Sequence, residues 1–540
     1  MRRLIIILFL IPIISFAQKK DYKNFDKAVR YNTEGNIEKS IKYANKALEN
    51  TSDWNLPNLL LASIYANNNQ IDLAVDYILK VYDENDPNDR KGIEQVVKLY
   101  YSNGFYNEAL FYADRIIAYD LDKNRANSDM DRYVENCKFA IEAIKTPVDF
   151  NPINLDNNVN SSFAEFVNTV SVDGKKLFFT RRIEYDDRKP QEDLFSFNLN
   201  DSIVIPLPFN TQANEGAITV SPDGRLCVYT ACDRQNSIGS CDLFVRYYNS
   251  ESGWSQEYNL GENVNSEKWE TQASFSPDGN YLYFISNREG GFGGDDIWRS
   301  EITVEGFLKA ENIGETINTK YNEMSPFSHP DNLTFYFGSN GHIGMGDYDI
   351  YISRRKSTIE EWGSPKNIGF PINTHNAENS LVVANDGRTA YYTSNKSGFG
   401  LEDVFVFKLP KNMQADEVSE LELNIITQRV GGEVVLENVT FASNSSEIDT
   451  SSYAELEKLI AYLTKNPALQ IEIQGHTDDV GSELDNLVLS KERARSVYNY
   501  LIDKVQNKLS YKGYGELKPL ASNELENGRE LNRRTSFIIW

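Results

Sequence analysis

The sequence has little of the residue types that usually carry metal or nucleophilic chemistry. It contains four histidines and four cysteines in 540 residues. No histidine stands at ligand spacing from a cysteine or from another histidine, so no metal site is expected. No pair of acidic residues is marked out as an acid and a nucleophile. We therefore expect a chain that is not an enzyme and needs no cofactor.

Positive charge is also scarce. The chain has 55 Lys and Arg against 79 Asp and Glu, which gives a formal net charge of −24. Nucleic acid is excluded as a partner, because its phosphates demand a basic surface.

Long apolar runs are missing beyond the N-terminus. Arg2 and Arg3 precede the apolar residues 4–14, a run too short to span a bilayer. Ser15-Phe16-Ala17 then offers the small residues that a signal peptidase reads, so residues 1–17 are predicted to be a signal peptide. An uncleaved anchor is the alternative. The first cysteine is Cys137, so lipid attachment is not expected, and the mature chain should have no membrane-spanning segment.

Three of the four cysteines cluster in the middle of the chain. Export makes a disulfide permissible. Cys232 and Cys241 bracket a short polar loop and are the predicted pair. Cys227 lies in an apolar strand pattern, where we expect a buried thiol.

The first region, residues 21–145, repeats one helical pattern three times. Equivalent positions at Ala28, Ala62 and Val97 are 34 and 35 residues apart. This period, with small residues where paired helices approach, resembles tetratricopeptide (TPR) repeats. The resemblance implies a concave protein-binding surface. A further helix near 127–145 would cap the stack, and a plain helical bundle is the alternative.

The second region, residues 150–410, consists of short alternating strands with turn signals. A unit recurs five times: Asp followed by Gly or Asn, an aromatic strand, and then Asp before two apolar residues. The turns begin at Asp173, Asp223, Asp278, Asp331 and Asp386, which are 50 to 55 residues apart. Asp-Gly favours a tight hairpin in which both central residues have positive φ. Five such units, each able to form a four-stranded sheet, predict a five-bladed β-propeller.

Two recurring sequence motifs in this region resemble those of a known propeller family. Ser276-Pro277-Asp278-Gly279 and Ser286-Asn287-Arg288 resemble the PD40 repeats of TolB-type, WD40-like propellers. Enzymatic propellers of the sialidase type carry an Asp box with one residue between Asp and Gly. Here the two are adjacent, so the repeated Asp residues are better explained as turn formers.

Residues 411–432 are predicted to be an acidic linker, and residues 433–540 to be a final α/β region. Strands are expected at 434–441, 470–475, 509–514 and 535–539, and helices at 451–465 and 484–503. This order predicts a small sheet with helices on one side.

Four phrases coincide in this last region, in order. They are Phe441-Ala442-Ser443-Asn444, Gly475-His476-Thr477-Asp478, the helical stretch from Asn486 to Ala494, and Gly513 to Pro519 followed by Asn532-Arg533-Arg534. Together they strongly resemble the OmpA-like, peptidoglycan-binding family of domains.

The resemblance implies a site for the diaminopimelate side chain of peptidoglycan. That side chain ends in an ammonium and a carboxylate on one carbon. By resemblance, Asp478 takes the ammonium and Arg493 takes the carboxylate, for which a planar guanidinium allows two parallel bonds. Asn486 and Asn444 occupy the family's positions for peptide-stem contacts, and Thr477 and Val480 line the same loop. The alternative is an ordinary surface ion pair, which contributes about 0–1 kcal/mol.

The order of the regions resembles that of Bacteroidetes cell-envelope proteins, in particular the peptidoglycan-binding component of type IX secretion. The chain departs from that pattern by lacking a carboxypeptidase-regulatory-like domain and a lipoprotein cysteine. We expect a periplasmic adaptor at the outer membrane, with peptidoglycan and outer-membrane or secretion-system proteins as partners. The alternative is a propeller that binds or processes a glycan or peptide and is only positioned by the OmpA-like domain.

Overall fold

The computed structural model describes residues 19–86, 89–122, 129–185, 189–378, 380–395, 398–428, 432–442 and 444–540. The predicted signal peptide lies outside these residues. The chain divides into two compact units. The first contains residues 1–148 together with 343–349 and 369–378, and the second contains the remainder. Within the described ranges, no helix is both long and apolar enough to cross a membrane.

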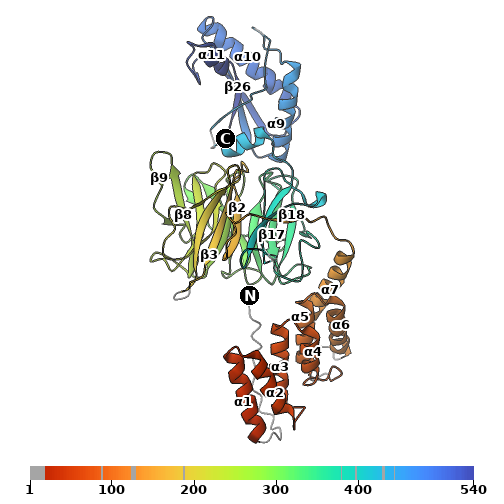
Figure 1. The fold of residues 1–540 in the computed structure, drawn as a ribbon. Coiled ribbons are helices and arrows are strands. Elements are labelled where there is room, and N and C mark those ends of the chain that lie inside the picture. Colours follow the sequence, from red (N-terminus) through yellow and green to blue (C-terminus); the bar gives the residue numbers. More distant parts are fainter. Residues whose placement is uncertain are drawn as a thin grey trace. The chain divides into compact units, whose positions relative to one another are not determined.

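The N-terminal part of the first unit is helical (Figure 1). Its helices are α1 (Lys19–Thr33), α2 (Ile37–Leu48), α3 (Asn55–Asn67), α4 (Ile71–Leu79), α5 (Arg90–Tyr101), α6 (Tyr106–Asp122) and α7 (Met130–Lys145). The turns inside the first three helix pairs contain Gly35, Asn69 and Gly104, all with positive φ. Glycine and asparagine suit these turns because they tolerate the left-handed conformation that ends a helix.

One pair of rings recurs in this helical region. Stacked tyrosines link the two helices of each pair, with ring centroids 5.4 Å, 5.5 Å and 6.1 Å apart. The pairs are Tyr31 with Tyr43, Tyr65 with Tyr77, and Tyr100 with Tyr112. The equivalent small positions Ala28 and Ala62 are both buried. The region is thus built from one repeated contact, and its interpretation as TPR repeats stays a prediction.

Five antiparallel sheets follow. Each is named by one of its edge strands, which is called the first strand of that sheet. The β2 sheet contains β2 (Ala164–Val170), β3 (Lys176–Ile183), β4 (Gln191–Asn198) and β5 (Ile203–Pro206). The β6 sheet contains β6 (Glu215–Val220), β7 (Leu226–Cys232), β8 (Cys241–Asn249), β9 (Gly253–Trp254) and β10 (Tyr258–Asn259). The β11 sheet contains β11 (Glu270–Phe275), β12 (Tyr281–Ser286), β13 (Asp296–Thr303), β14 (Gly306–Phe307) and β15 (Glu311–Asn312).

The last two sheets complete the region. The β16 sheet contains β16 (Glu323–Ser328), β17 (Thr334–Ser339), β18 (Asp349–Arg354) and β19 (Lys366–Asn367). The β20 sheet contains β20 (Leu381–Val383), β21 (Thr389–Ser394), β22 (Asp403–Lys408) and β1 (Ile153–Asn154). Because β1 pairs with β22, through Ile153 and Val406, the first strand of the region lies in its last sheet.

The second strand of each sheet supplies a fully buried ring. These rings belong to Phe179, Tyr229, Tyr283, Tyr336 and Tyr392. Each large ring removes much apolar area from water, which explains why the predicted strands are rich in aromatics.

The Asp-Gly turns differ from the prediction that both central residues have positive φ. Gly174, Gly224, Gly279 and Gly387 have φ between 68° and 72°, whereas the preceding aspartates do not have positive φ. Instead, the Asp173 carboxylate accepts a hydrogen bond of 3.1 Å from the backbone N–H of Lys175. The aspartate therefore stabilises the turn through its side chain, as Asx turns do.

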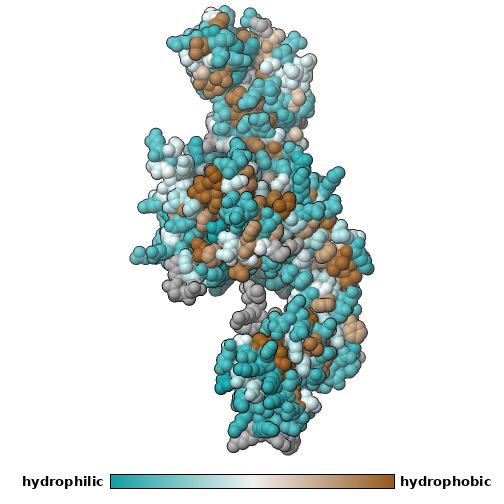
Figure 2. Space-filling model, viewed as in Figure 1, coloured by the Kyte–Doolittle hydropathy of each residue, from teal (hydrophilic) through white to brown (hydrophobic). Residues whose placement is uncertain are grey.

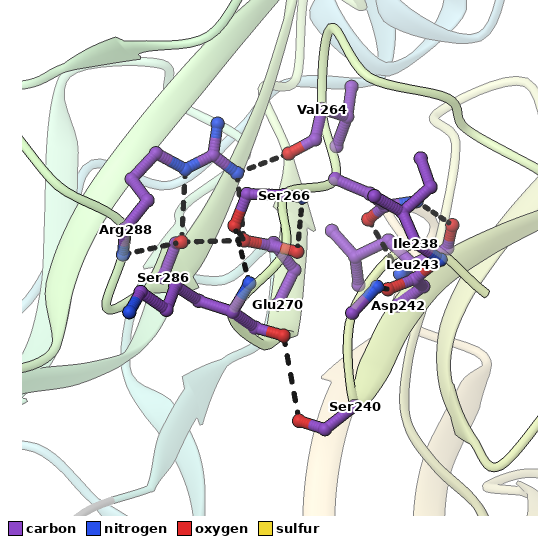
Figure 3. Close-up of polar contacts among 12 residues, drawn as sticks. Ile238, Ser240, Asp242, Leu243, Val264, Ser266, Glu270, Ser286 and Arg288 are labelled. Atoms are coloured by element: carbon purple, nitrogen blue, oxygen red, sulfur yellow. Dashed lines mark hydrogen bonds and ion pairs between the residues drawn. The ribbon is translucent and has the colours of Figure 1, made fainter.

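A buried glutamate stands near the start of every sheet. Each accepts hydrogen bonds from the backbone N–H and the hydroxyl of a Ser or Thr four residues earlier. The five are Glu165, Glu215, Glu270, Glu323 and Glu378. Figure 3 shows the network around Glu270, with Ser266, Ser286 and Arg288 directed at its carboxylate.

Cys232 and Cys241 form a disulfide that joins the end of β7 to the start of β8. Cys227 and Cys137 are free, buried thiols. Burial raises the pKa of each thiol to about 12, so neither is an accessible thiolate.

The C-terminal region contains one mixed sheet of order β23-β26-β24-β25, in which only β24 and β25 are parallel. Its elements are α8 (Glu420–Thr427), β23 (Glu433–Val435), α9 (Tyr453–Lys465), β24 (Gln470–His476), α10 (Glu483–Leu501), β25 (Lys508–Gly515), α11 (Glu526–Asn532) and β26 (Thr535–Ile539). Buried Leu456, Leu459 and Val497 pack from α9 and α10 against Ile473 and Phe537 of the sheet.

Two local predictions for this part need correction. The strand predicted at 434–441 ends at Val435, because a turn at residues 437–438 breaks it. The segment 411–432, predicted to be a linker, contains α8, which begins at a capping box of Ser419 and Glu422. Leu421 and Ile425 of this helix join the C-terminal hydrophobic core.

The surface in the view of Figure 2 is mostly hydrophilic, with apolar residues in small separate groups. Charged residues make up 25% of the chain. Since charged side chains are rarely buried, they account for much of this hydrophilic surface.

Candidate functional site

The predicted site residues gather where β24 ends. Asp478 lies two residues past β24, and Arg493 lies on α10, which packs against β24 and β25. The antiparallel pair of β24 and β26 sets Gly475 opposite Thr535. Arg533, two residues before β26, is thereby brought beside Asp478.

Asp478 is almost completely buried and is held at both carboxylate oxygens. Its Oδ2 lies 2.7 Å from Nη1 of Arg533, and its Oδ1 accepts a hydrogen bond of 3.1 Å from the Val480 N–H. Its side chain is 10% exposed, against 39% for Arg533. A largely desolvated anion therefore faces a cation that remains open to solvent.

Arg493 is fixed by contacts to the loop that follows Leu436. Its Nε donates a hydrogen bond of 3.0 Å to the carbonyl of Ser445, and its guanidinium lies 5.2 Å from the ring centroid of Phe441. Burial lowers the pKa of Arg493, the charge of Asp478 opposes this shift, and Arg533 adds to it. Among the described residues, Nε is the only nitrogen of this guanidinium that forms a hydrogen bond.

Asp478 forms its ion pair with a residue outside the predicted set. No ion pair within 4 Å joins Asp478 to Arg493 in the described part of the chain, and Arg533 is the partner instead. Arg533 belongs to one of the quoted motifs but was not predicted to be part of the site. Its 55-residue separation from Asp478 hid the contact, and only the pairing of β24 with β26 reveals it.

The remaining predicted residues have unequal roles in this arrangement. Asn486, on α10, donates to the carbonyl of Asp478 and, at 2.7 Å, to Glu516, so it braces the loop. Thr477 is buried, and its hydroxyl has no hydrogen-bond partner among the described residues. Val480, in the loop between β24 and α10, is 66% exposed. Asn444 is exposed, with a left-handed backbone at φ 54°.

A second set of interacting side chains lies at the end of β24. Arg534 pairs with Glu433 at 2.8 Å, and His476 lies 3.5 Å from the same carboxylate while stacking on Tyr514. Burial is the main cause that lowers the pKa of His476, so its ring is neutral near pH 7. These residues support the end of β24.

The geometry brings one buried carboxylate together with two guanidinium groups, at the end of a strand in a mixed α/β fold. Residues 440–533 match the OmpA family. The matched stretch contains Asp478, Arg493 and Arg533, and the last of these is its final residue. The OmpA-family domain thus includes every charged group of the candidate site.

Known relatives match a stretch of similar length. Outer membrane porin F of Pseudomonas fluorescens is 34% identical over 104 residues, which cover 19% of this chain and 32% of that protein. Peptidoglycan-binding protein ArfA of Mycobacterium tuberculosis is 30% identical over 103 residues, with 19% and 32% covered. The chain spans about a third of the length of these curated relatives.

A solved structure shows the same extent of similarity. The peptidoglycan-associated lipoprotein of Burkholderia pseudomallei is 29% identical, and the match covers 19% of this chain and 88% of that one, with a TM-score of 0.18.

Proposed function

We propose that this protein is a non-enzymatic periplasmic adaptor that binds the diaminopimelate side chain of peptidoglycan through its OmpA-family domain. The domain would tether an outer-membrane or secretion assembly, of the type IX kind by resemblance, to the cell wall. The similarity to a protein named for peptidoglycan binding supports this substrate class.

The observation that carries the proposal is the cluster of Asp478, Arg533 and Arg493. A zwitterionic ligand group needs an anion for its ammonium and a cation for its carboxylate, a few ångströms apart. Asp478 supplies a desolvated anion, and the terminal nitrogens of Arg493, which form no hydrogen bond to the described residues, suit a carboxylate. Arg533 balances Asp478 in the free protein and lies open enough to shift when a ligand ammonium arrives.

The other two regions would hold protein partners. The repeated tyrosine pairs of α1 to α6 support an interpretation as TPR repeats, which bind proteins on a concave face. Five sheets whose first strands line one cavity support an interpretation as a five-bladed propeller.

Co-sedimentation of the full chain with diaminopimelate-type peptidoglycan tests the proposal. Asp478→Ala and Arg493→Ala should each weaken binding about tenfold or more, because each removes a hydrogen bond to a charged group. The matched control is Arg495→Ala, which removes an exposed arginine from the same helix. Binding at the wild-type level in both site variants would overturn the assignment.

A further inference from the structure

A cavity of about 270 Å³ lies among the five sheets. The first strand of every sheet contributes to its wall. Representative wall residues are Val167 of β2, Ile218 of β6, Gln272 of β11, Phe327 of β16 and Val382 of β20. The volume is just below the usual range of small-ligand sites, about 300–1,000 Å³, so the cavity suits a small ligand.

The wall is held by unusual backbone geometry. Four of the five first strands break register where they face the cavity. Ala217, Gln272 and Ser325 lie at three of these breaks with φ of 52°, 49° and 50°. A left-handed conformation is costly for a residue other than glycine, and such residues concentrate at ligand sites.

Hydrogen bonds between neighbouring sheets fix the wall. Gln272 accepts at 2.9 Å from the N–H of Ser325, and the Thr180 hydroxyl accepts at 3.0 Å from the N–H of Ala217. The hydroxyls of Thr230 and Thr271 lie 3.0 Å apart. The cavity is therefore formed before a ligand arrives.

Glu192 is the charged residue of the lining, which contains no Lys, Arg or His. Its carboxylate accepts no hydrogen bond from the described residues, whereas its backbone N–H is bonded to Asn214. A Cβ atom at Gly216 would stand 3.1 Å from Oε2 of Glu192, so the glycine leaves room for the carboxylate. In the part of the chain that the structure describes, no cation lies within ion-pair distance of this carboxylate, whereas the buried glutamates of three of the five sheets each pair with an arginine. Burial raises the pKa of Glu192, and the charge of Arg182, opposite it on β3, opposes that shift.

We propose that this cavity binds a small ligand through a primary ammonium group, which pairs with Glu192. Wall amides and hydroxyls such as Asn168, Asn214 and Thr230 accept or donate the remaining hydrogen bonds, and Phe166 and Phe327 cover the apolar part. Two sources offer this chemistry: a free aliphatic amine, or the N-terminal residues of a peptide. The inference is independent of peptidoglycan binding at Asp478.

Calorimetric titration of the full chain with four probes tests the proposal. Triglycine represents a peptide end and diaminobutane a free amine, while N-acetyltriglycine and butanediol are their uncharged counterparts. An amine probe should bind at least about tenfold more tightly than its counterpart, since the charge-assisted bond is lost in the latter. Binding of triglycine alone identifies a peptide end, and binding of diaminobutane alone identifies a free amine.

Two substitutions connect that binding to Glu192. Glu192→Gln and Gly216→Ala should each weaken binding of the amine probe, the first by charge and the second by occupying the space beside the carboxylate. Glu305→Gln, at an exposed glutamate of the β11 sheet, is the control and should leave binding unchanged. Binding of neither amine, equal binding of the uncharged probes, or unchanged binding by Glu192→Gln would each overturn the proposal.

Discussion

The β11 and β16 sheets place a buried glutamate at the same position and surround it with the same hydroxyls. Glu270 accepts from Ser266 at 2.6 Å and from Ser286 at 2.6 Å. Glu323 accepts from Thr319 at 2.8 Å and from Ser339 at 2.7 Å. The geometry of the two carboxylates is therefore nearly identical.

The two sheets differ in the charge that faces the glutamate. In the β11 sheet, Arg288 lies 3.0 Å from Glu270 and also donates to the carbonyl of Val264 (Figure 3). In the β16 sheet, Gly341 takes the place of that arginine, and His342 donates instead to the equivalent carbonyl, that of Ile317, at 2.8 Å.

The consequence appears in the pKa of the unpaired glutamate. Burial lowers the pKa of His342, so its imidazole is neutral near pH 7 and supplies no cation. Burial without a cation raises the pKa of Glu323 to about 7. Hydroxyl and backbone donors thus fix where both carboxylates lie, and burial is the main cause of the raised pKa of Glu323.

The largest effect is expected when the cation of the β11 sheet is removed. Arg288→Met would leave Glu270 buried without its guanidinium partner, as Glu323 is, and breaking a buried ion pair costs about 3–5 kcal/mol of unfolding free energy. Urea unfolding followed by tryptophan fluorescence measures this loss. Arg225→Met, at an exposed arginine, is the control. A change of similar size in both variants would contradict the role of the ion pair.

A smaller, pH-dependent effect is expected at Glu323. Between its usual pKa of 4.5 and about 7, the folded state keeps a proton that the unfolded state has lost, so unfolding free energy falls as pH rises through this window. Glu323→Gln cannot lose that proton. Relative to wild type, the variant should gain up to about 3 kcal/mol as pH rises from below to above the window.

The readout for Glu323 is the difference in unfolding free energy between variant and wild type across pH. Glu251→Gln, which removes one exposed acid, corrects for the general loss of negative charge. A difference that stays constant with pH would show that Glu323 is compensated by some other group.

The β6 sheet adds a covalent bond at the corresponding loop. The disulfide between Cys232 and Cys241 joins the two ends of the loop between β7 and β8. Hydrogen bonds hold the corresponding loops of the β11 and β16 sheets. Replacing both cysteines with serine should cost about 2–3 kcal/mol, because a short loop regains chain entropy when unfolded. Thermal unfolding with and without reductant checks this, and the reductant should not affect the double variant.

The sequence predicted the repeating turns and strands of these sheets, but not which charged side chains meet in them. The Asp-Gly turns and aromatic strands repeat at regular spacing, so five units could be recognised from the spacing alone. That Arg288 reaches Glu270 depends on a contact between neighbouring strands, which spacing does not show.

The same limit applies to the candidate site. Asp478 and Arg493 stand in motifs and were assigned by resemblance, whereas Arg533 lies 55 residues from its partner. Likewise, the turn at residues 437–438 was hidden in an apolar run that resembled one long strand. Local pattern predicts elements, but long-range pairing decides which charges meet.

The smallest effect on stability is expected at Arg533, which extends the comparison to an arginine that is more exposed to solvent. Arg533 lies 2.7 Å from Asp478, and Arg288 lies 3.0 Å from Glu270, but the side chain of Arg533 is 39% exposed against 14% for Arg288. Solvent screens the exposed guanidinium, so Arg533→Met should change unfolding free energy by at most about 1 kcal/mol. The charge of Arg493 still acts on Asp478 in that variant. Urea unfolding of Arg533→Met beside Arg288→Met measures the contrast, and losses of equal size would show that burial does not govern the contribution of these ion pairs.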